Sequence, residues 1–223
     1  MLNNTQKDLL VSIVIGDGGI YKQGRFYSYA IAVGHGESQK DYCKWKMNLL
    51  NEADIFDSKI TLHTRKIKHP NGREYIQYHF QKCGFCLKYI FDRIIIDGKK
   101  SVRDVLSMLK TKRAVAIWFM DDGGVEPGRW KDKDGNIHFT RPNLKLCTNS
   151  FPYDEQLLIQ KWFKQRWNIN CTIREERKIN NTTCFLRFPA DDAEKLYKEI
   201  LREYITCCES MKHKFRHFIE KYE

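Results

Sequence analysis

Two similar stretches of the chain carry the side chains best suited to chemistry. Residues 10–19 read LVSIVIGDGG and residues 115–124 read VAIWFMDDGG, so each apolar run ends on a carboxylate and two glycines. A helix that is apolar nearly all round must be buried on every side, and glycine tolerates the backbone angles that end a helix. We therefore expect two helices that pack against each other and place Asp17 and Asp122 side by side at their ends. This arrangement predicts a paired-carboxylate metal site on a pseudo-twofold axis.

Paired carboxylates of this kind are suited to phosphodiester hydrolysis. The reaction needs an activated water, neutralised charge at the phosphorus and a stabilised leaving oxygen, and bound Mg²⁺ supplies all three. Magnesium prefers hard oxygen ligands such as carboxylates and phosphates. The helix dipole disfavours a carboxylate at a helix C-terminus, so two such acids indicate a partner cation. The alternative is that each acid only caps a group near its helix end.

The composition favours a folded protein with a polyanionic partner. The 223 residues include 39 Lys and Arg against 28 Asp and Glu, for a formal net charge of +11. Lysine and arginine beside phosphates release counterions and strengthen binding, so nucleic acid is the natural partner. The eight cysteines include four inside patterned segments, as reduced core thiols would be, which indicates a reducing compartment. We see neither a segment long enough to span a bilayer nor a secretory signal.

The elements that must position the two acids repeat in the same order. A break at 97–100 separates two halves, and a short helix over 102–109 leads into the second apolar run. We predict domains at 1–98 and 111–223, joined by a connector at 99–110, with each half arranged as αββαββα. The expected first half has hairpins over 20–33 and 58–81 and helices over 40–51 and 85–96. The expected second half has hairpins over 130–149 and 171–188 and helices over 154–167, 190–204 and 212–222.

The free faces of the predicted sheets alternate basic and polar side chains with apolar ones. In the strand predicted over 59–68, Ile60 and Leu62 face one way, while His63 and Arg65 face the other. Strand ribbons fit the DNA major groove and present side chains to base edges. An exposed sheet also carries charge simply for solubility, but the net charge and the repetition favour DNA. The candidate DNA contacts are Tyr21, Lys22, Arg25, Lys59, His63, Arg65, Arg73, Arg141, Lys145, Arg174 and Lys178.

These motifs resemble those of the LAGLIDADG homing endonucleases of the single-chain kind, which carry both motifs in one polypeptide. Residues 118–124, WFMDDGG, are similar to one subgroup's spelling, and residues 15–19, IGDGG, are a looser match. The resemblance implies an α+β fold of two αββαββα halves related by a pseudo-twofold axis. Its motif helices would lie at the interface, and its antiparallel sheets would form a DNA-binding saddle. It also implies a monomer that cuts both strands of a long asymmetric site, leaves short 3′ overhangs and promotes intron mobility.

The resemblance also implies particular roles at the site. The last acid of each motif, Asp17 or Asp122, binds Mg²⁺, and the backbone carbonyls of Gly16 and Asp121 are the expected auxiliary ligands. We expect Mn²⁺ to substitute and Ca²⁺ to bind without supporting cleavage. The side chain of Asp121 has no acidic counterpart in the first motif, so its expected role is structural.

Basic and polar residues outside the motifs complete the implied site. Lys100 and Lys214 match the family's active-site lysines, and their neighbours Lys99 and Lys212 are the alternative assignments. Asn149 matches the residue that orders metal-bound water. The corresponding place in the first half falls on Gly36, beside His35 and Glu37, which departs from the family pattern and makes unequal cutting of the two strands an open alternative.

Two other activities use the same fold. Some relatives are RNA-splicing maturases that assist the host intron, and others are catalytically silent binding proteins. Loss of a motif acid would mark the silent class, and both acids are present here. The expected location is the compartment that holds the encoding genome, either an organelle (mitochondrion or chloroplast) or the cytoplasm of a bacterium or phage host.

Overall fold

The computed structural model describes residues 1–24, 28–68, 72–178 and 181–223. The candidate DNA contact Arg25 lies outside these residues. Among the described residues, no helix is both long enough and apolar enough to cross a membrane.

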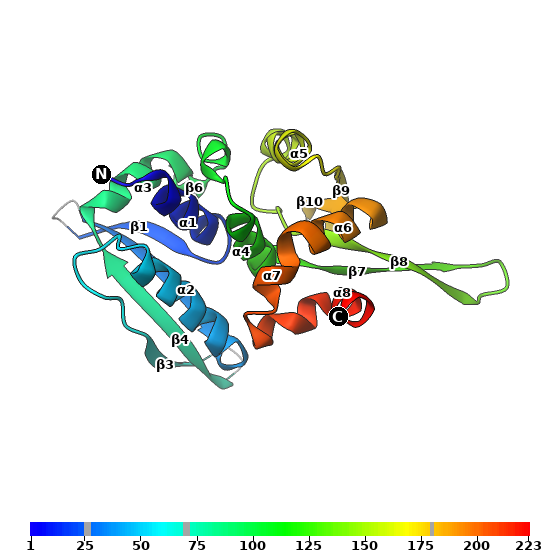
Figure 1. The fold of residues 1–223 in the computed structure, drawn as a ribbon, viewed down its shortest axis with the longest axis horizontal. Coiled ribbons are helices and arrows are strands. Elements are labelled where there is room, and N and C mark those ends of the chain that lie inside the picture. Colours follow the sequence, from blue (N-terminus) through cyan, green and yellow to red (C-terminus); the bar gives the residue numbers. More distant parts are fainter. Residues whose placement is uncertain (25–27, 69–71, 179–180) are drawn as a thin grey trace.

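The first half of the chain forms a four-stranded antiparallel sheet covered by helices (Figure 1). Its strands lie in the order β1-β2-β4-β3. In chain order the elements are α1 (Asn4–Ile15), β1 (Gly19–Gln23), β2 (Ser28–Gly36), η1 (Glu37–Gln39), α2 (Lys40–Glu52), β3 (His63–Lys68), β4 (Glu74–Cys83), η2 (Phe85–Leu87) and α3 (Lys88–Ile94).

The second half repeats this arrangement and adds a longer C-terminal end. Its sheet has the order β7-β8-β10-β9. In both sheets the order is therefore first, second, fourth and third strand of the half. The elements are α4 (Lys112–Asp122), β7 (Gly123–Lys131), β8 (Ile137–Leu146), α5 (Tyr153–Trp167), β9 (Thr172–Lys178), β10 (Asn181–Phe188), α6 (Ala190–Leu196), the π-helical η4 (Tyr197–Leu201), α7 (Arg202–Ile205), η5 (Glu209–Phe215) and α8 (Arg216–Tyr222). The predicted α+β fold of two similar halves is confirmed.

The two motif helices α1 and α4 lie against each other in the centre of the molecule (Figure 1). Residues 8–15 of α1 and 114–121 of α4 are buried, as expected for helices that are apolar nearly all round. The buried carboxylate of Asp8 on α1 accepts hydrogen bonds from the backbone N–H and the hydroxyl of Thr111, the N-cap residue of α4. A side chain of the first motif helix thus caps the start of the second.

The segment between the halves is mostly irregular, which corrects the helix expected over 102–109. It contains a small hairpin, β5 (Ile95–Ile96) with β6 (Lys99–Lys100), and one 3₁₀ turn, η3 (Leu106–Met108). The carboxylate of Glu155 on α5 accepts hydrogen bonds from the Ser101 hydroxyl and the Val102 backbone N–H. Because these long-range bonds satisfy the backbone, the segment does not need helical hydrogen bonds of its own.

Several element boundaries also differ from the sequence expectation. The strand expected from residue 58 begins only at His63, because the Asn51 side chain pairs with both the N–H and the carbonyl of Ile60. The predicted helix over 85–96 ends at Ile94, where the chain enters β5. The segment expected as a helix over 212–222 becomes α-helical only at Arg216, after the 3₁₀ helix η5.

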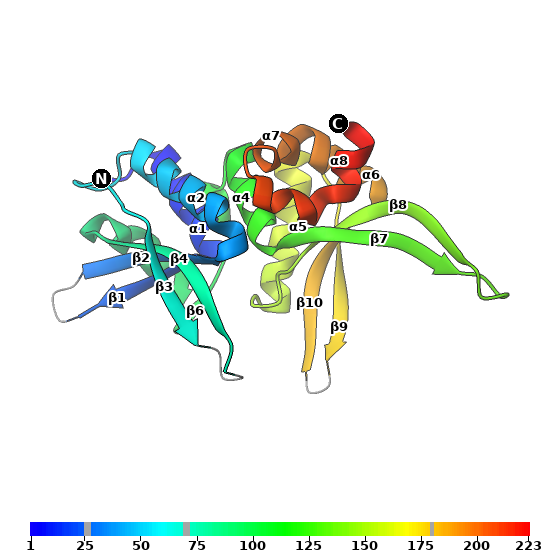
Figure 2. The ribbon, with the colours of Figure 1, turned by 90° about the horizontal axis from the view of Figure 1, so that it is seen from below.

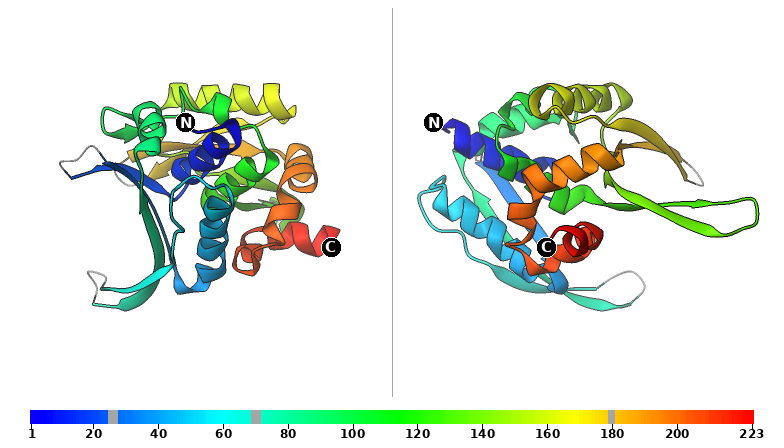
Figure 3. Two further views of the ribbon diagram at one scale, coloured as in Figure 1. Left: turned by 60° about the vertical axis from the view of Figure 1, so that its left-hand side comes forward. Right: turned by 45° about the vertical axis from the view of Figure 1, so that its right-hand side comes forward.

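The two sheets lie on the opposite side of the molecule from α2, α7 and α8 (Figure 2). The hairpin of β7 and β8 projects well beyond the rest of the second half (Figures 2 and 3). Its pairing runs from Gly123↔Leu146 to Lys131↔Ile137, whereas that of β1 and β2 runs from Gly19↔Ala32 to Gln23↔Ser28. The two sheets therefore share a topology but differ in length.

Candidate active site

Asp17 and Asp122 lie at the C-terminal ends of the two packed motif helices. Asp122 is the last residue of α4, and Asp17 follows the C-cap residue Gly16 of α1. The charge of Asp17 raises the pKa of Asp122, and the charge of Asp121, also on α4, raises the pKa of Asp17. The fold therefore places both acids at the ends of the two packed helices.

The glycines after the two acids serve a purpose different from the one expected. Neither Gly18 nor Gly123 has a positive φ angle, so left-handed backbone angles do not explain them. A Cβ on Gly18 would lie 2.5 Å from the carbonyl oxygen of Ile13, and one on Gly123 would lie 2.4 Å from that of Phe119. Glycine is needed because the chain passes directly over the last turn of each helix.

A lysine donates hydrogen bonds to the carbonyl oxygens at the end of each motif helix. Lys100 Nζ lies 2.7 Å from the Gly16 oxygen and 2.9 Å from the Gly18 oxygen. Lys214 Nζ lies 2.7 Å from the oxygens of both Met120 and Asp121. The two ammonium groups occupy equivalent places and offset the negative ends of the helix dipoles.

The alternative lysines lie elsewhere. Lys99 is exposed, and Lys212 pairs with Glu209 beside it in sequence. The structure therefore brings the expected pair, Lys100 and Lys214, to the helix ends.

Burial and nearby negative charge make it costly for either acid to ionise without a cation. Burial, followed by the charges of Asp121 and Asp17, raises the pKa of Asp122 to about 7. Although Asp17 keeps solvent-exposed surface, the protein around it and the charge of Asp121 raise its pKa as well. Burial lowers the pKa of Lys100 and of Lys214, while the nearby acids oppose that change. Acids that resist ionisation for these reasons gain most from a bound metal, so the donor set fits a divalent ion.

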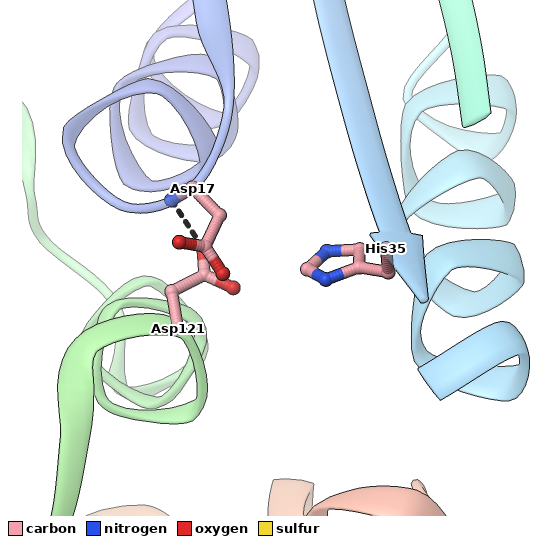
Figure 4. Close-up of side chains that lie close together, drawn as sticks. All are labelled: Asp17, His35 and Asp121. Atoms are coloured by element: carbon pink, nitrogen blue, oxygen red, sulfur yellow. Dashed lines mark hydrogen bonds between the residues drawn. The ribbon is translucent and has the colours of Figure 1, made fainter. Parts of the chain in front are cut away.

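The side chain of Asp121 is fully buried and contacts residues of the first half. Its carboxylate forms an ion pair with Lys46 and accepts hydrogen bonds from the Tyr42 hydroxyl, at 2.8 Å, and the Asp17 backbone N–H, at 3.1 Å. Its expected structural role agrees with these contacts. Figure 4 shows the carboxylate beside Asp17, with the ring of His35 facing both acids from β2.

Sequence reasoning missed Lys46, Tyr42 and the part played by His35. Lys46 has no exposed surface, and its Nζ also lies 3.2 Å from His35 Nε2. A signal was available, since Lys46 follows Tyr42 by one helical turn on the apolar face of the expected helix. A lysine on such a face needs a buried partner, but the sequence did not indicate which acid that would be.

Asn149 and Gly36 lie at equivalent distances along the chain in the two halves, although Gly36 ends β2 and Asn149 lies in the turn after β8. Gly19 pairs with Ala32 and Gly124 pairs with Lys145, and four residues further along are Gly36 and Asn149. Asn149 Nδ2 donates to the Thr183 hydroxyl, at 2.9 Å, and its buried Oδ1 has no partner among the described residues. The first half has no side chain at this place, so the two halves are chemically unequal.

Comparison with known proteins identifies the family. The sequence profile of the LAGLIDADG DNA endonuclease family matches residues 7–196. The chain belongs to this family. The expectation from its motifs, that it is a LAGLIDADG protein and a DNA endonuclease, is confirmed.

Named relatives cover most of this LAGLIDADG chain. It is 28% identical over 209 residues to a probable intron-encoded endonuclease 1 of Wickerhamomyces canadensis, covering 92% of this chain and 81% of the relative. It is 21% identical to the DNA endonuclease I-ChuI of Chlamydomonas applanata, covering 93% of each.

Solved structures share the fold. The homing endonuclease I-WcaI, bound to its DNA recognition sequence, aligns with a TM-score of 0.73 at 23% identity, covering 96% of this chain and 87% of that one. I-DmoI in complex with DNA and Ca aligns with a TM-score of 0.52 at 16% identity, covering 91% and 92%.

Most of the expected DNA contacts of this LAGLIDADG protein are exposed on the sheet strands or just outside them. Tyr21, Lys22, Arg65 and Arg174 are exposed on sheet strands, and His63 is exposed at the start of β3. Lys59 and Arg73 are exposed just outside the strands, because β3 and β4 begin later than expected. The backbone of Lys178 ends β9, and its side chain is outside the described part of the structure.

Two further candidates are engaged by acids. Arg141 on β8 pairs with Asp191 at the start of α6, on the helix side of the sheet. Lys145 pairs with Glu176 on β9, on the other face, at 3.3 Å. Arg141 is therefore the weaker candidate for a DNA contact.

Proposed function

We propose that this protein is a homing endonuclease that makes Mg²⁺-dependent double-strand breaks in a long asymmetric DNA site. The breaks would leave short 3′ overhangs and promote mobility of the encoding intron. The observation that carries the proposal is the pair of acids, Asp17 and Asp122, at the ends of two packed helices, each end bound by a half-buried lysine.

The proposed metal ligands are the carboxylates of Asp17 and Asp122 and the backbone carbonyls of Gly16 and Asp121. Each of these two carbonyls already accepts one hydrogen bond from a lysine, and its second lone pair is available. When bound, the metal would supply the activated water and neutralise charge at the phosphate. Structures of I-DmoI determined with Mg, Ca or Mn support a divalent ion. We propose that Mn²⁺ substitutes for Mg²⁺ and that Ca²⁺ binds without supporting cleavage.

The chain's own residues would orient the reacting groups. Lys100 and Lys214 hold the ends of the motif helices and place a positive charge beside the scissile phosphates, where a fixed ammonium stabilises developing negative charge. Asn149, through its unpartnered Oδ1, would order a water molecule in the second half. The first half would rely on water held without a side chain at Gly36.

The two sheets would bind the DNA duplex along the major groove. The exposed basic residues of β1, β3 and β9 support this, as does the net charge of +11. Because one chain supplies both motifs, we propose that it acts as a monomer, with halves at 1–98 and 111–223. The intron-encoded relatives support a compartment that holds the encoding genome.

The test is cleavage of a supercoiled plasmid library of random inserts, with the cut ends sequenced. We expect discrete double-strand breaks with 3′ overhangs in Mg²⁺ and binding alone in Ca²⁺. Asp17→Asn and Asp122→Asn should each abolish double-strand cleavage while DNA affinity in Ca²⁺ is kept. Asp104→Asn is the matched control, because Asp104 is an exposed acid in the connector.

One result of this cleavage assay would contradict the proposal. If the wild-type protein binds nucleic acid in a salt-sensitive way but cuts no member of the library, the nuclease proposal is wrong for those sequences. A splicing assay with the host intron RNA would then test the maturase alternative.

A further inference from the structure

Lys46 and Asp121 form a fully buried ion pair between the two halves. Lys46 belongs to α2 of the first half and Asp121 to α4 of the second, and neither side chain has exposed surface. Burying two charges costs free energy that their attraction only partly returns. Stability alone is therefore a weak explanation for this pair.

The ammonium of Lys46 already occupies the space between the other polar groups. Asp17, His35 and Asp121 place ligand atoms within 4.8 Å of one another, which on its own would suggest a metal site. However, Lys46 Nζ donates to both His35 Nε2 and Asp121 Oδ1, while His35 Nδ1 lies 3.0 Å from Gln39 Oε1. Two members of the trio are thus bound by the Lys46 ammonium, and Asp17, the exposed member, lies beside Asp121 and faces the His35 ring (Figure 4).

The other oxygen of Asp121 binds the backbone of Asp17. Its Oδ2 accepts the Asp17 N–H at 3.1 Å, while Oδ1 accepts the Tyr42 hydroxyl and the Lys46 ammonium. A chain of contacts therefore runs from Lys46 through Asp121 to the backbone of Asp17. It fixes the first acid from across the interface between the halves.

The second acid has no such support. Gly16 stands where the second motif has Asp121, so no carboxylate reaches from α1 toward Asp122. Helix α2 begins at Lys40 and its counterpart α5 begins at Tyr153, 113 residues later. By this offset, Ile159 is the residue of the second half that corresponds to Lys46. The place of the charged pair is thus taken by a glycine and an aliphatic residue.

We propose that Lys46 and the carboxylate of Asp121 are positioning residues for Asp17, and that they set the cleavage rate of one DNA strand only. The inference rests on the proposed nuclease function. Catalytic groups must be held within about 0.5 Å of their productive geometry. Releasing the backbone N–H of Asp17 should misplace its carboxylate, while Asp122, whose helix end is bound by Lys214, stays in place.

The experiment measures cleavage of each strand separately on the protein's own site. Lys46→Met and Asp121→Asn should each slow cleavage of one DNA strand by about 100-fold. The affected strand should be the same in both variants. The other strand should change by less than about threefold, and DNA affinity in Ca²⁺ should be unchanged. Supercoiled plasmid should then accumulate as nicked circles. Lys44→Met is the matched control, because Lys44 is an exposed lysine on the same helix.

A double variant separates positioning from stability. Lys46→Ile with Asp121→Gly copies the arrangement of Ile159 and Gly16, and it removes both buried charges together. It should fold with a Tm at or above those of the single variants. Cleavage of the affected strand should nevertheless stay slow, so the product should be nicked DNA. Equal slowing of both strands in folded single variants, or equal cutting of both strands by the double variant, would overturn the proposal.

Hydrogen exchange tests the positioning role of Lys46 and Asp121 without a cleavage assay. In the wild-type protein the backbone N–H of Asp17 should be protected, and Asp121→Gly with Lys46→Ile should remove that protection while the amides of α1 keep theirs. If the wild-type protein cuts no DNA, the proposed function fails, and this exchange still decides whether the network holds Asp17. Unchanged protection at Asp17 would refute the positioning role.

Discussion

The carboxylate of Asp121 occupies the space that a side chain at residue 16 would need. A Cβ built on Gly16 would lie 2.3 Å from Asp121 Oδ2 and 2.8 Å from Asp121 Cβ. Gly16 and Asp121 hold the same place in the two motifs, so the small residue of one motif makes room for the large residue of the other. The difference between the motifs is therefore a packing requirement at the pseudo-twofold axis.

Gly16→Ala should consequently destabilise the protein. Forcing a methyl group into a packed site typically costs about 1–3 kcal/mol, and here it would also displace the hydrogen bond from Asp17. We expect a lower Tm in thermal denaturation. Gly124→Ala is the control, because a Cβ there meets nothing within 4 Å. In an Asp121→Gly background the alanine should cost little, and an equal loss in both backgrounds would contradict this explanation.

Removing the charge of Asp122 should stabilise the metal-free protein while it abolishes cleavage. The folded-state pKa of Asp122 is about 7, above its ordinary value of 3.8. The folded protein therefore holds a proton that the unfolded chain releases, and the associated stability is lost as pH rises through about 7. In EDTA, the wild-type Tm should fall relative to that of Asp122→Asn between about pH 4 and pH 7 and keep a constant difference above that range.

Magnesium should reverse this difference. Because the metal binds the ionised carboxylate, Mg²⁺ should raise the wild-type Tm most at high pH and leave Asp122→Asn nearly unchanged. Asp104→Asn should follow the wild type throughout. Parallel pH curves for the wild type and Asp122→Asn in EDTA would show that the carboxyl group is not perturbed.

Lys100→Met and Lys214→Met should each reduce the cleavage rate by about 100-fold or more. In other active sites, removal of one hydrogen-bond donor that stabilises the charge of the transition state lowers the rate by about this factor. DNA affinity in Ca²⁺ should change little, because each lysine is half-buried and its ammonium is hydrogen-bonded to its helix end. The neighbouring Lys99→Met and Lys212→Met are matched controls that remove the same charge one or two residues away. Loss of cleavage in these controls instead would reassign the site lysines.

The long hairpin should make the DNA footprint asymmetric. Pairing of Gly19 with Ala32 encloses residues 19–32, whereas pairing of Gly124 with Lys145 encloses residues 124–145, so each strand of the second hairpin is four residues longer. At about 3.3 Å per residue this is about 13 Å, or about four base pairs at 3.4 Å each. Hydroxyl-radical footprints in Ca²⁺ should extend further from the cleavage point on one side by that amount.

A shortened hairpin tests the same point directly. Replacing residues 129–139 with a three-residue loop containing glycine would match the length of the first hairpin. The variant should lose the outer part of the footprint and bind more weakly, but should cut at the same phosphates. An unchanged footprint would mean that the outer hairpin does not contact DNA.

Much of the site was predictable because its parts are local and repeated. The apolar runs that end at Asp17 and Asp122 require two buried helices, and a chain with two of them can bury both by packing one on the other. The alternating strands and the turn at Asp134 and Gly135 likewise depend on neighbours a few residues away. Lys100 and Lys214 came from the family resemblance, and their positions in the fold agree with it.

Element ends were predicted less well, and the reason is physical. The strand at Ile60 is displaced by the side chain of Asn51, and the irregular segment around Val102 depends on Glu155, 53 residues further along the chain. Such partners satisfy backbone groups that local periodicity assigns to helix or strand. A local sequence pattern does not indicate which distant side chain will form such a hydrogen bond.

The sequence by itself determined that the chain is a tandem duplication, that each half ends a buried helix on an acid, and that the surface is basic. Only the tertiary structure decided how the two motifs became unequal. The buried ammonium of Lys46 has its counter-charge in Asp121, 75 residues away and on the other half. Which buried charges meet depends on how α2 and α4 cross, and that geometry exists only once the core has packed.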